Sequence, residues 1–118
     1  MFLAPKQVHL HYGLEKPVKI LQLTDVHVGY GDPEDSVGRK RNMGGCRYGF
    51  FKEGKYPPRS PSGFLKEAME YSKDFDFTVI TGDLLNYFSR SNLEICHNIL
   101  SGHDYMYCSG NQDRKSVV

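Results

Sequence analysis

Residues 18–27 read Val-Lys-Ile-Leu-Gln-Leu-Thr-Asp-Val-His, an apolar and β-branched run that ends in a carboxylate and an imidazole. Such a run is typical of a β-strand that is covered on both faces. The second predicted strand covers residues 75–81, with Phe-Thr-Val-Ile-Thr at residues 77–81 as its central part, and it is followed by Gly-Asp at residues 82–83. A third predicted strand, residues 104–109, leads into Gly-Asn-Gln-Asp at residues 110–113. The sequence therefore predicts three core strands, each followed by polar side chains.

Two helices are predicted between these strands. Ser60 before Pro61 has the pattern of an N-cap followed by a proline in the first turn. The second helix is expected to begin at a capping box, with Ser91 as N-cap and Glu94 three residues later, and to end just before Gly102. The face of this helix that we expect to be buried consists of Leu93, Cys96, His97 and Leu100.

Residues 7–12, Gln-Val-His-Leu-His-Tyr, alternate polar and apolar, which predicts a further strand that forms a hairpin with residues 18–24. The expected order is β-β-α-β-α-β, and alternating strands and helices imply mostly parallel core strands joined by right-handed crossovers. The fold class is therefore α/β. Residues 29–60, rich in glycine and basic residues, interrupt this order and are interpreted as a long basic insertion in one domain, residues 1–118.

Composition narrows the class of protein. The net charge of the 118-residue chain is +1, and 25% of its residues are charged, so bulk electrostatics give no support for binding to nucleic acid or a membrane surface. The apolar runs are far shorter than the roughly 20 residues that span a bilayer. Three cysteines without C-x-x-C spacing indicate a reducing, cytoplasmic location, with Cys96 and Cys108 as small buried side chains.

The polar residues after the strands form a coherent set. In open parallel sheets, ligands bind outside the carboxyl ends of the strands. Asp25, His27, Asp83 and Asn111 all follow predicted strands and offer only oxygen and nitrogen donors, which suit Mn²⁺, Fe, Zn²⁺ or Co²⁺. The two oxygens of Asp83 could bridge two ions. Each motif alone is also common in an ordinary turn or exposed pair, so the prediction rests on finding all three together.

The three motifs, D-x-H, G-D and G-N, resemble those of the calcineurin-like metallophosphoesterases, and the resemblance extends from about residue 19 to residue 113. It implies a β-sandwich with flanking helices, two divalent metal ions and hydrolysis of phosphate mono- or diesters. By the same resemblance, Asp25, His27 and Asp83 hold the first ion, while Asp83 and Asn111 hold the second. The substrate expected is a phosphate ester, with nucleic acid among the open possibilities.

One of the two candidate catalytic residues, Gln112, departs from the family pattern, and this changes the role of the other, Asp113. Gln112 stands where the family usually has a histidine that assists phosphate binding and protonates the leaving group. A glutamine cannot exchange a proton near neutral pH, and general acid–base assistance is typically worth about 10²–10⁴ in rate. Asp113, which in the family orients that histidine, is left without this role.

The later histidine motifs of the family do not occur in the chain, so we expect the N-terminal half of such an enzyme, with weak or no turnover alone. The alternatives are a catalytically inactive remnant, and a binding module or subunit that is completed in trans. A third alternative is that the chain is the product of a reading frame that ends early. Loss of the rest of a sheet would leave an exposed strand edge, which favours self-association.

Overall fold

A computed structural model of the chain describes residues 5–29, 60–86 and 89–110. Within these ranges it contains three strands, two α-helices and one 3₁₀ turn. In chain order these are β1 (Ile20–Leu23), α2 (Pro61–Tyr71), η2 (Ser72–Asp74), β2 (Phe77–Thr81), α3 (Arg90–Leu100) and β3 (Met106–Cys108). The strands form one parallel sheet in the order β1-β2-β3. The prediction of an α/β chain with parallel core strands is confirmed.

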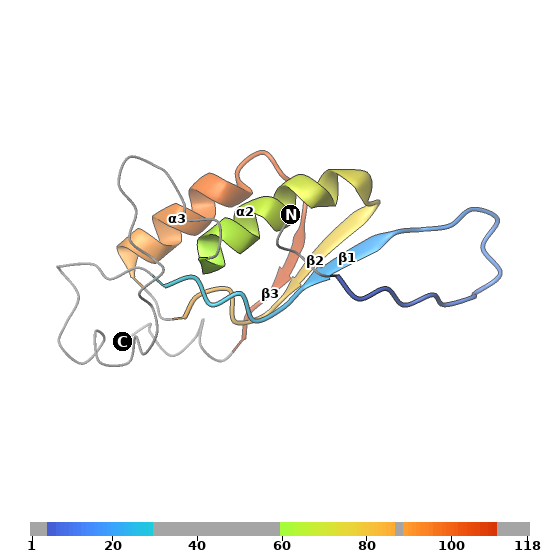
Figure 1. The fold of residues 1–118 in the computed structure, drawn as a ribbon, viewed down its shortest axis with the longest axis horizontal. Coiled ribbons are helices and arrows are strands. Elements are labelled where there is room, and N and C mark those ends of the chain that lie inside the picture. The colour runs from blue at the N-terminus through green and yellow to red at the C-terminus, as the bar shows by residue number, and fades with distance from the viewer. Residues whose placement is uncertain (1–4, 30–59, 87–88, 111–118) are drawn as a thin grey trace.

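Both helices lie on the same face of this sheet (Figure 1). Each strand is added on the same side of the previous one, in the order β1, β2, β3. Because both connections are right-handed crossovers, both helices lie on the same face of the sheet. The register pairs Ile20 with Phe77 and Val79 with Met106. All three strands therefore end at the same edge of the sheet, and this edge carries the loops that follow them.

The core lies between the helices and the sheet. Helix α2 begins at the predicted N-cap, where the Ser60 hydroxyl accepts a hydrogen bond from the Gly63 amide at 3.0 Å. Its spacing puts Leu65 and Met69 on one buried face, packed with Ile80 of the central strand, and burial of each such side chain stabilises the fold by roughly 1.5–3 kcal/mol. This packing fixes β2 under the helices and thereby fixes where β2 ends.

Helix α3 differs from its prediction in its start and in its buried face. The N-cap is Ser89 and not Ser91, because the Ser89 hydroxyl accepts from the Asn92 amide at 3.0 Å. Of the predicted stripe, Cys96 and Leu100 are buried as expected, whereas Leu93 is 43% exposed and His97 is also exposed, so the prediction was wrong for these two. The side chains that α3 buries are Asn92, Ile95, Cys96, Ile99 and Leu100. Their spacing follows the helical period equally well, and periodicity alone could not choose between the two faces.

The predicted first strand is not formed. Residues 7–12 carry no strand, and their apolar side chains Val8 and Tyr12 are 79% and 77% exposed. The segment runs away from the helices and the sheet (Figure 1), so its alternating side chains have no surface to pack against. The predicted hairpin was therefore wrong, and β1 is an edge strand of the described sheet, with β2 at its centre.

The second face of the sheet is not covered by the described helices. Ile20, Phe77 and Met106 are 59%, 53% and 56% exposed, although Ile20 belongs to the apolar run for which burial on both faces was predicted. Cys96 is buried as predicted, whereas Cys108 is exposed because β3 is an edge strand. Self-association through such an edge stays a prediction.

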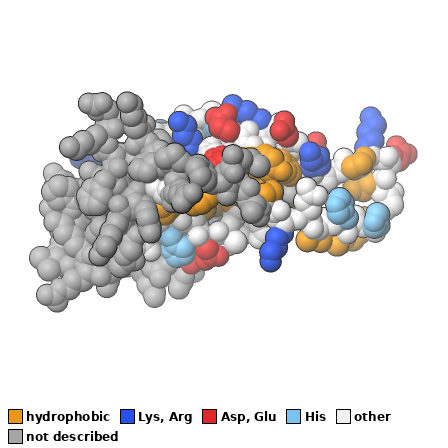
Figure 2. All heavy atoms as spheres, in the orientation of Figure 1, with side chains coloured by type: hydrophobic (Ala, Val, Ile, Leu, Met, Phe, Trp, Pro, Cys, Tyr) orange, Lys and Arg blue, Asp and Glu red, His pale blue; other side chains and the backbone are white. Residues whose placement is uncertain are grey.

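The described surface is mixed in charge. On the face shown in Figure 2, basic and acidic side chains are interspersed over the helices, as the near-zero net charge suggests. Neither described helix has the length and apolar character needed to cross a lipid bilayer. The predicted insertion at residues 29–60 lies almost entirely outside the described residues.

Candidate metal centre

Two loops meet at the carboxyl end of the sheet. Asp25 and His27 follow β1, and Asp83 follows β2. The loops are held together by backbone hydrogen bonds, from the Asp25 amide to the Gly82 carbonyl at 3.2 Å and from the His27 amide to the Asp83 carbonyl at 2.9 Å. A further bond joins the Val28 amide to the Leu84 carbonyl at 2.8 Å. Parallel pairing thus continues past the ends of the strands and brings the three side chains to one place.

The backbone of the same three residues is left-handed. Asp25, His27 and Asp83 have φ angles of 53°, 55° and 49°, and they are the non-glycine residues with positive φ within the described ranges. This conformation costs roughly 1–2 kcal/mol for an ordinary residue, and Asp and His accept it more readily than most. Residues held in such conformations concentrate at functional sites, where the surrounding structure fixes them.

These three residues form what we call the three-ligand cluster. Their potential ligand atoms all lie within 4.8 Å of one another. His27 Nε2 lies 3.7 Å from Asp25 Oδ1 and 3.9 Å from Asp83 Oδ2. Asp83 is the most enclosed of the three side chains, at 17% exposed, whereas Asp25 is 60% exposed. The cluster is therefore anchored on the Asp83 side and open to solvent on the Asp25 side.

The spacing of these three side chains can be compared with that of a metal site. Oxygen and nitrogen ligands stand about 2.0–2.2 Å from a zinc ion, which puts two donors on a tetrahedral edge about 3.4 Å apart. The two distances from His27 Nε2 exceed this value by about 0.3 and 0.5 Å, and all three ligand atoms lie within 4.8 Å of one another, so the side chains would have to close around an ion to coordinate it. Two carboxylates and one imidazole, with no thiolate, are also the donor types that Mn²⁺, Fe, Zn²⁺ and Co²⁺ accept.

The pKa of the Asp25 carboxyl is lowered from its ordinary value. The main cause is a hydrogen bond of 2.7 Å that the Thr24 hydroxyl donates to Asp25 Oδ2; partial desolvation acts in the opposite direction, and the neighbouring His27 side chain adds to the lowering. Because the lowered pKa favours the ionised form, Asp25 remains a carboxylate at neutral pH and well into the acid range. The group is therefore in the state that a metal ion requires.

The loop that follows β3, which we call the third loop, also reaches the three-ligand cluster. A Cβ atom built on Gly110 would overlap both the carboxylate and the backbone amide of Asp83, so only glycine fits at this position. Asp83 Oδ1 is the carboxylate atom on the Gly110 side, whereas Oδ2 lies toward His27. The next three predicted site residues, Asn111, Gln112 and Asp113, lie outside the described residues.

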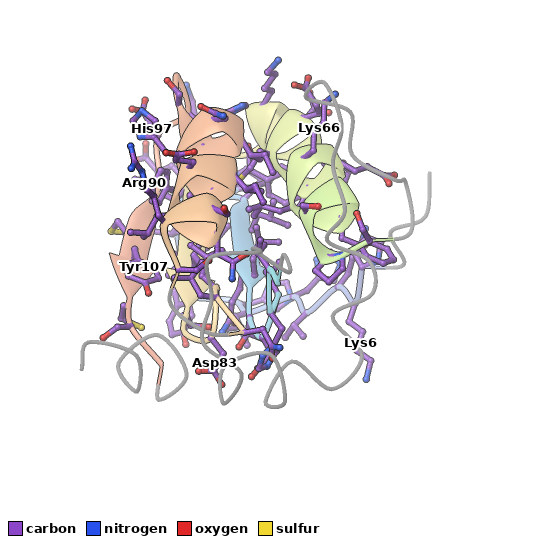
Figure 3. All side chains as sticks on the ribbon, turned by 90° about the vertical axis from the view of Figure 1, so that its left-hand side faces the viewer. Lys6, Lys66, Asp83, Arg90, His97 and Tyr107 are labelled. Carbon is purple, nitrogen blue, oxygen red and sulfur yellow. The ribbon has the colours of Figure 1, made fainter. Side chains whose placement is uncertain are left out.

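The structure thus brings together Asp25, His27 and Asp83 of the predicted site. Asp83 lies beyond the end of the sheet, and His97 lies on α3, far from it (Figure 3). Thr24, whose hydroxyl contacts the candidate ligand Asp25, was not predicted from the sequence. The only signal for it in the sequence is a hydroxyl residue directly before the first acidic residue.

Comparison of the chain with protein-family models, with curated proteins and with solved structures found no significant match.

Proposed function

We propose that this chain carries the metal site of a divalent-metal-dependent phosphoesterase, which hydrolyses phosphate mono- or diesters. The observation that carries the proposal is the three-ligand cluster. Two carboxylates and an imidazole, with their ligand atoms within 4.8 Å of one another, lie at the carboxyl ends of two neighbouring parallel strands. The motifs that supply these residues are also those that resemble the calcineurin-like metallophosphoesterases.

Each side chain has a distinct part in this proposal. Asp83, the least exposed, anchors the ion against the sheet, and His27 supplies a neutral nitrogen ligand. Asp25 lies on the solvent side, so a phosphate ester would approach the site from there. A divalent ion held in this way polarises a phosphoryl group and lowers the pKa of a water molecule. The two carboxylate charges would balance the +2 charge of the ion.

A second ion is supported by the orientation of Asp83. Its Oδ2 atom lies 3.9 Å from His27 Nε2, while Oδ1 is on the side of Gly110, the residue directly before Asn111. The two oxygens therefore face two sides, an arrangement that would allow Asp83 to hold two ions. The resemblance assigns Asn111 to the second ion, and two ions about 3.5–4 Å apart are a common arrangement for phosphoryl transfer.

A metal-binding module without turnover is the second candidate function. Gln112 favours it, because an amide side chain cannot supply the proton that the leaving group needs. In this case the chain would bind the ion and phosphate but would hydrolyse esters slowly or would need a partner that completes the site. The two candidates agree on the cluster and differ in the rate of reaction.

Mn²⁺ is the probe that tests the proposal. We expect Mn²⁺ at 100 times its Kd to stabilise the purified chain by about 2.7 kcal/mol, seen as a higher Tm. We also expect slow, Mn²⁺-dependent release of nitrophenolate from bis(p-nitrophenyl) phosphate or p-nitrophenyl phosphate, abolished by EDTA.

The outcomes separate the candidates. A raised Tm together with metal-dependent hydrolysis supports the phosphoesterase. If the Tm rises but neither ester is hydrolysed above the rate of Mn²⁺ alone, the chain is a metal-binding module. A Tm that ignores Mn²⁺, Zn²⁺ and Co²⁺ would rule out both.

A further inference from the structure

Thr24 stands between the sheet and the candidate metal centre. Its hydroxyl lies 2.7 Å from Asp25 Oδ2 and 3.2 Å from the Thr81 carbonyl oxygen. The contact with Asp25 is the shorter, and a hydrogen bond to an ionised acceptor is stronger than one to a neutral carbonyl. The hydroxyl therefore donates chiefly to the carboxylate, while the nearby end of β2 limits where the Thr24 side chain can turn.

The Thr24 hydroxyl belongs to a row of polar contacts between β1 and β2. Gln22 Nε2 donates to the Thr81 hydroxyl at 3.0 Å, and this hydroxyl is 3.4 Å from the Leu23 carbonyl oxygen. The row links the ends of both strands next to the cluster. The row contains the side chains of Gln22, Thr81 and Thr24, and it is the Thr24 hydroxyl that contacts a candidate ligand.

The two oxygens of Asp25 are therefore in different situations. Oδ2 accepts from Thr24, while Oδ1 is the atom 3.7 Å from His27 Nε2. We propose that Thr24 is a positioning residue that holds the Asp25 carboxylate with Oδ1 directed toward the metal and Oδ2 withheld from it. This inference rests on the proposed metal site and adds to it a specific orientation of one ligand, and hence binding through a single oxygen.

The need for such a residue follows from the exposure of Asp25. At 60% exposed, this side chain is not held by packing and would sample several rotamers if the hydrogen bond were absent. Residues that orient a metal ligand are typically worth 10- to 100-fold in metal affinity. Because the bond from Thr24 is exposed to water, we expect the lower end of this range, a loss of about 10-fold.

The test compares Thr24→Val, which keeps the shape and removes the hydroxyl, with Thr24→Ser, which keeps the hydroxyl. Gln22→Ala is the matched control, because Gln22 belongs to the same row but does not touch Asp25. Two quantities are measured in the full chain. The first is Mn²⁺ affinity by calorimetry, and the second is the rotamer distribution of Asp25 without metal, from three-bond NMR couplings between its α and β protons.

We expect Thr24→Val to lower Mn²⁺ affinity about 10-fold and to average the Asp25 couplings, while Thr24→Ser and Gln22→Ala retain the affinity and the couplings of the unchanged chain. Unchanged Asp25 couplings in Thr24→Val would overturn the proposal. So would a Thr24→Ser variant as impaired as Thr24→Val. The NMR measurement needs no metal, so it decides the role of Thr24 even if the chain binds no ion, in which case the proposed function alone would fail.

Discussion

Asp83→Asn is expected to lower the affinity of the chain for Mn²⁺ by on the order of 100-fold or more, and to abolish any metal-dependent ester hydrolysis. Loss of a residue that merely orients a ligand costs about 10- to 100-fold, and Asp83 is itself a ligand in the proposed site. It is also the most enclosed member of the cluster and faces both His27 and Gly110. Asparagine accepts left-handed backbone well, so this substitution removes the charge without disturbing the turn.

The matched control for this variant is Asp104→Asn. Asp104 is an exposed acidic residue of the described chain that lies before β3, at the opposite end of that strand from the cluster. Calorimetric titration with Mn²⁺ should give the unchanged affinity for this control. If Asp83→Asn also bound Mn²⁺ as the unchanged chain does, the ion would be held elsewhere and the site would be misassigned.

A second large effect is expected from a single methyl group. In Gly110→Ala the new Cβ would overlap the carboxylate and the backbone amide of Asp83. Since backbone atoms cannot move aside as a flexible side chain can, the third loop must shift, at a cost of roughly 1–3 kcal/mol. The shift would also displace the Asp83 carboxylate, so Mn²⁺ affinity should fall together with the free energy of unfolding in urea.

Gly102→Ala separates the two consequences. Gly102 has a φ of 80° at the end of α3, and a Cβ there would meet nothing within 4 Å. An alanine should therefore lower the stability by about 1–2 kcal/mol through backbone strain alone and leave Mn²⁺ affinity unchanged. An equal loss of metal affinity in both variants would mean that the effect of Gly110→Ala comes from general destabilisation and not from its contact with Asp83.

The sequence predicted the sheet and the cluster for one physical reason. In parallel strands the residues after each carboxyl end meet at one edge, so strand prediction alone was enough to bring Asp25, His27 and Asp83 together. The N-cap at Ser60 was also predictable, because its hydroxyl satisfies an amide within three residues along the chain. Both features depend on local pattern and on chirality rules that hold across proteins.

What the sequence could not show depends on partners that are distant along the chain. Residues 7–12 alternate as a strand should, yet alternation produces a strand only where another strand and a core face are in reach. The choice of buried face on α3 was likewise decided by where α2 and β2 lie. Thr24 was missed because its contact with Asp25 Oδ2 depends on side-chain rotation, which the order of residues does not indicate.

Locating the ion tests the proposed metal site most directly. Crystals of the chain soaked in Mn²⁺ would be measured with X-rays at the manganese absorption edge, where anomalous scattering marks the metal. We expect a peak enclosed by Asp25 Oδ1, His27 Nε2 and Asp83 Oδ2, at roughly the 2.0–2.2 Å typical of such ligands. A Mn²⁺ peak at another place, or no peak between these three side chains at saturating Mn²⁺, would contradict the proposed metal site.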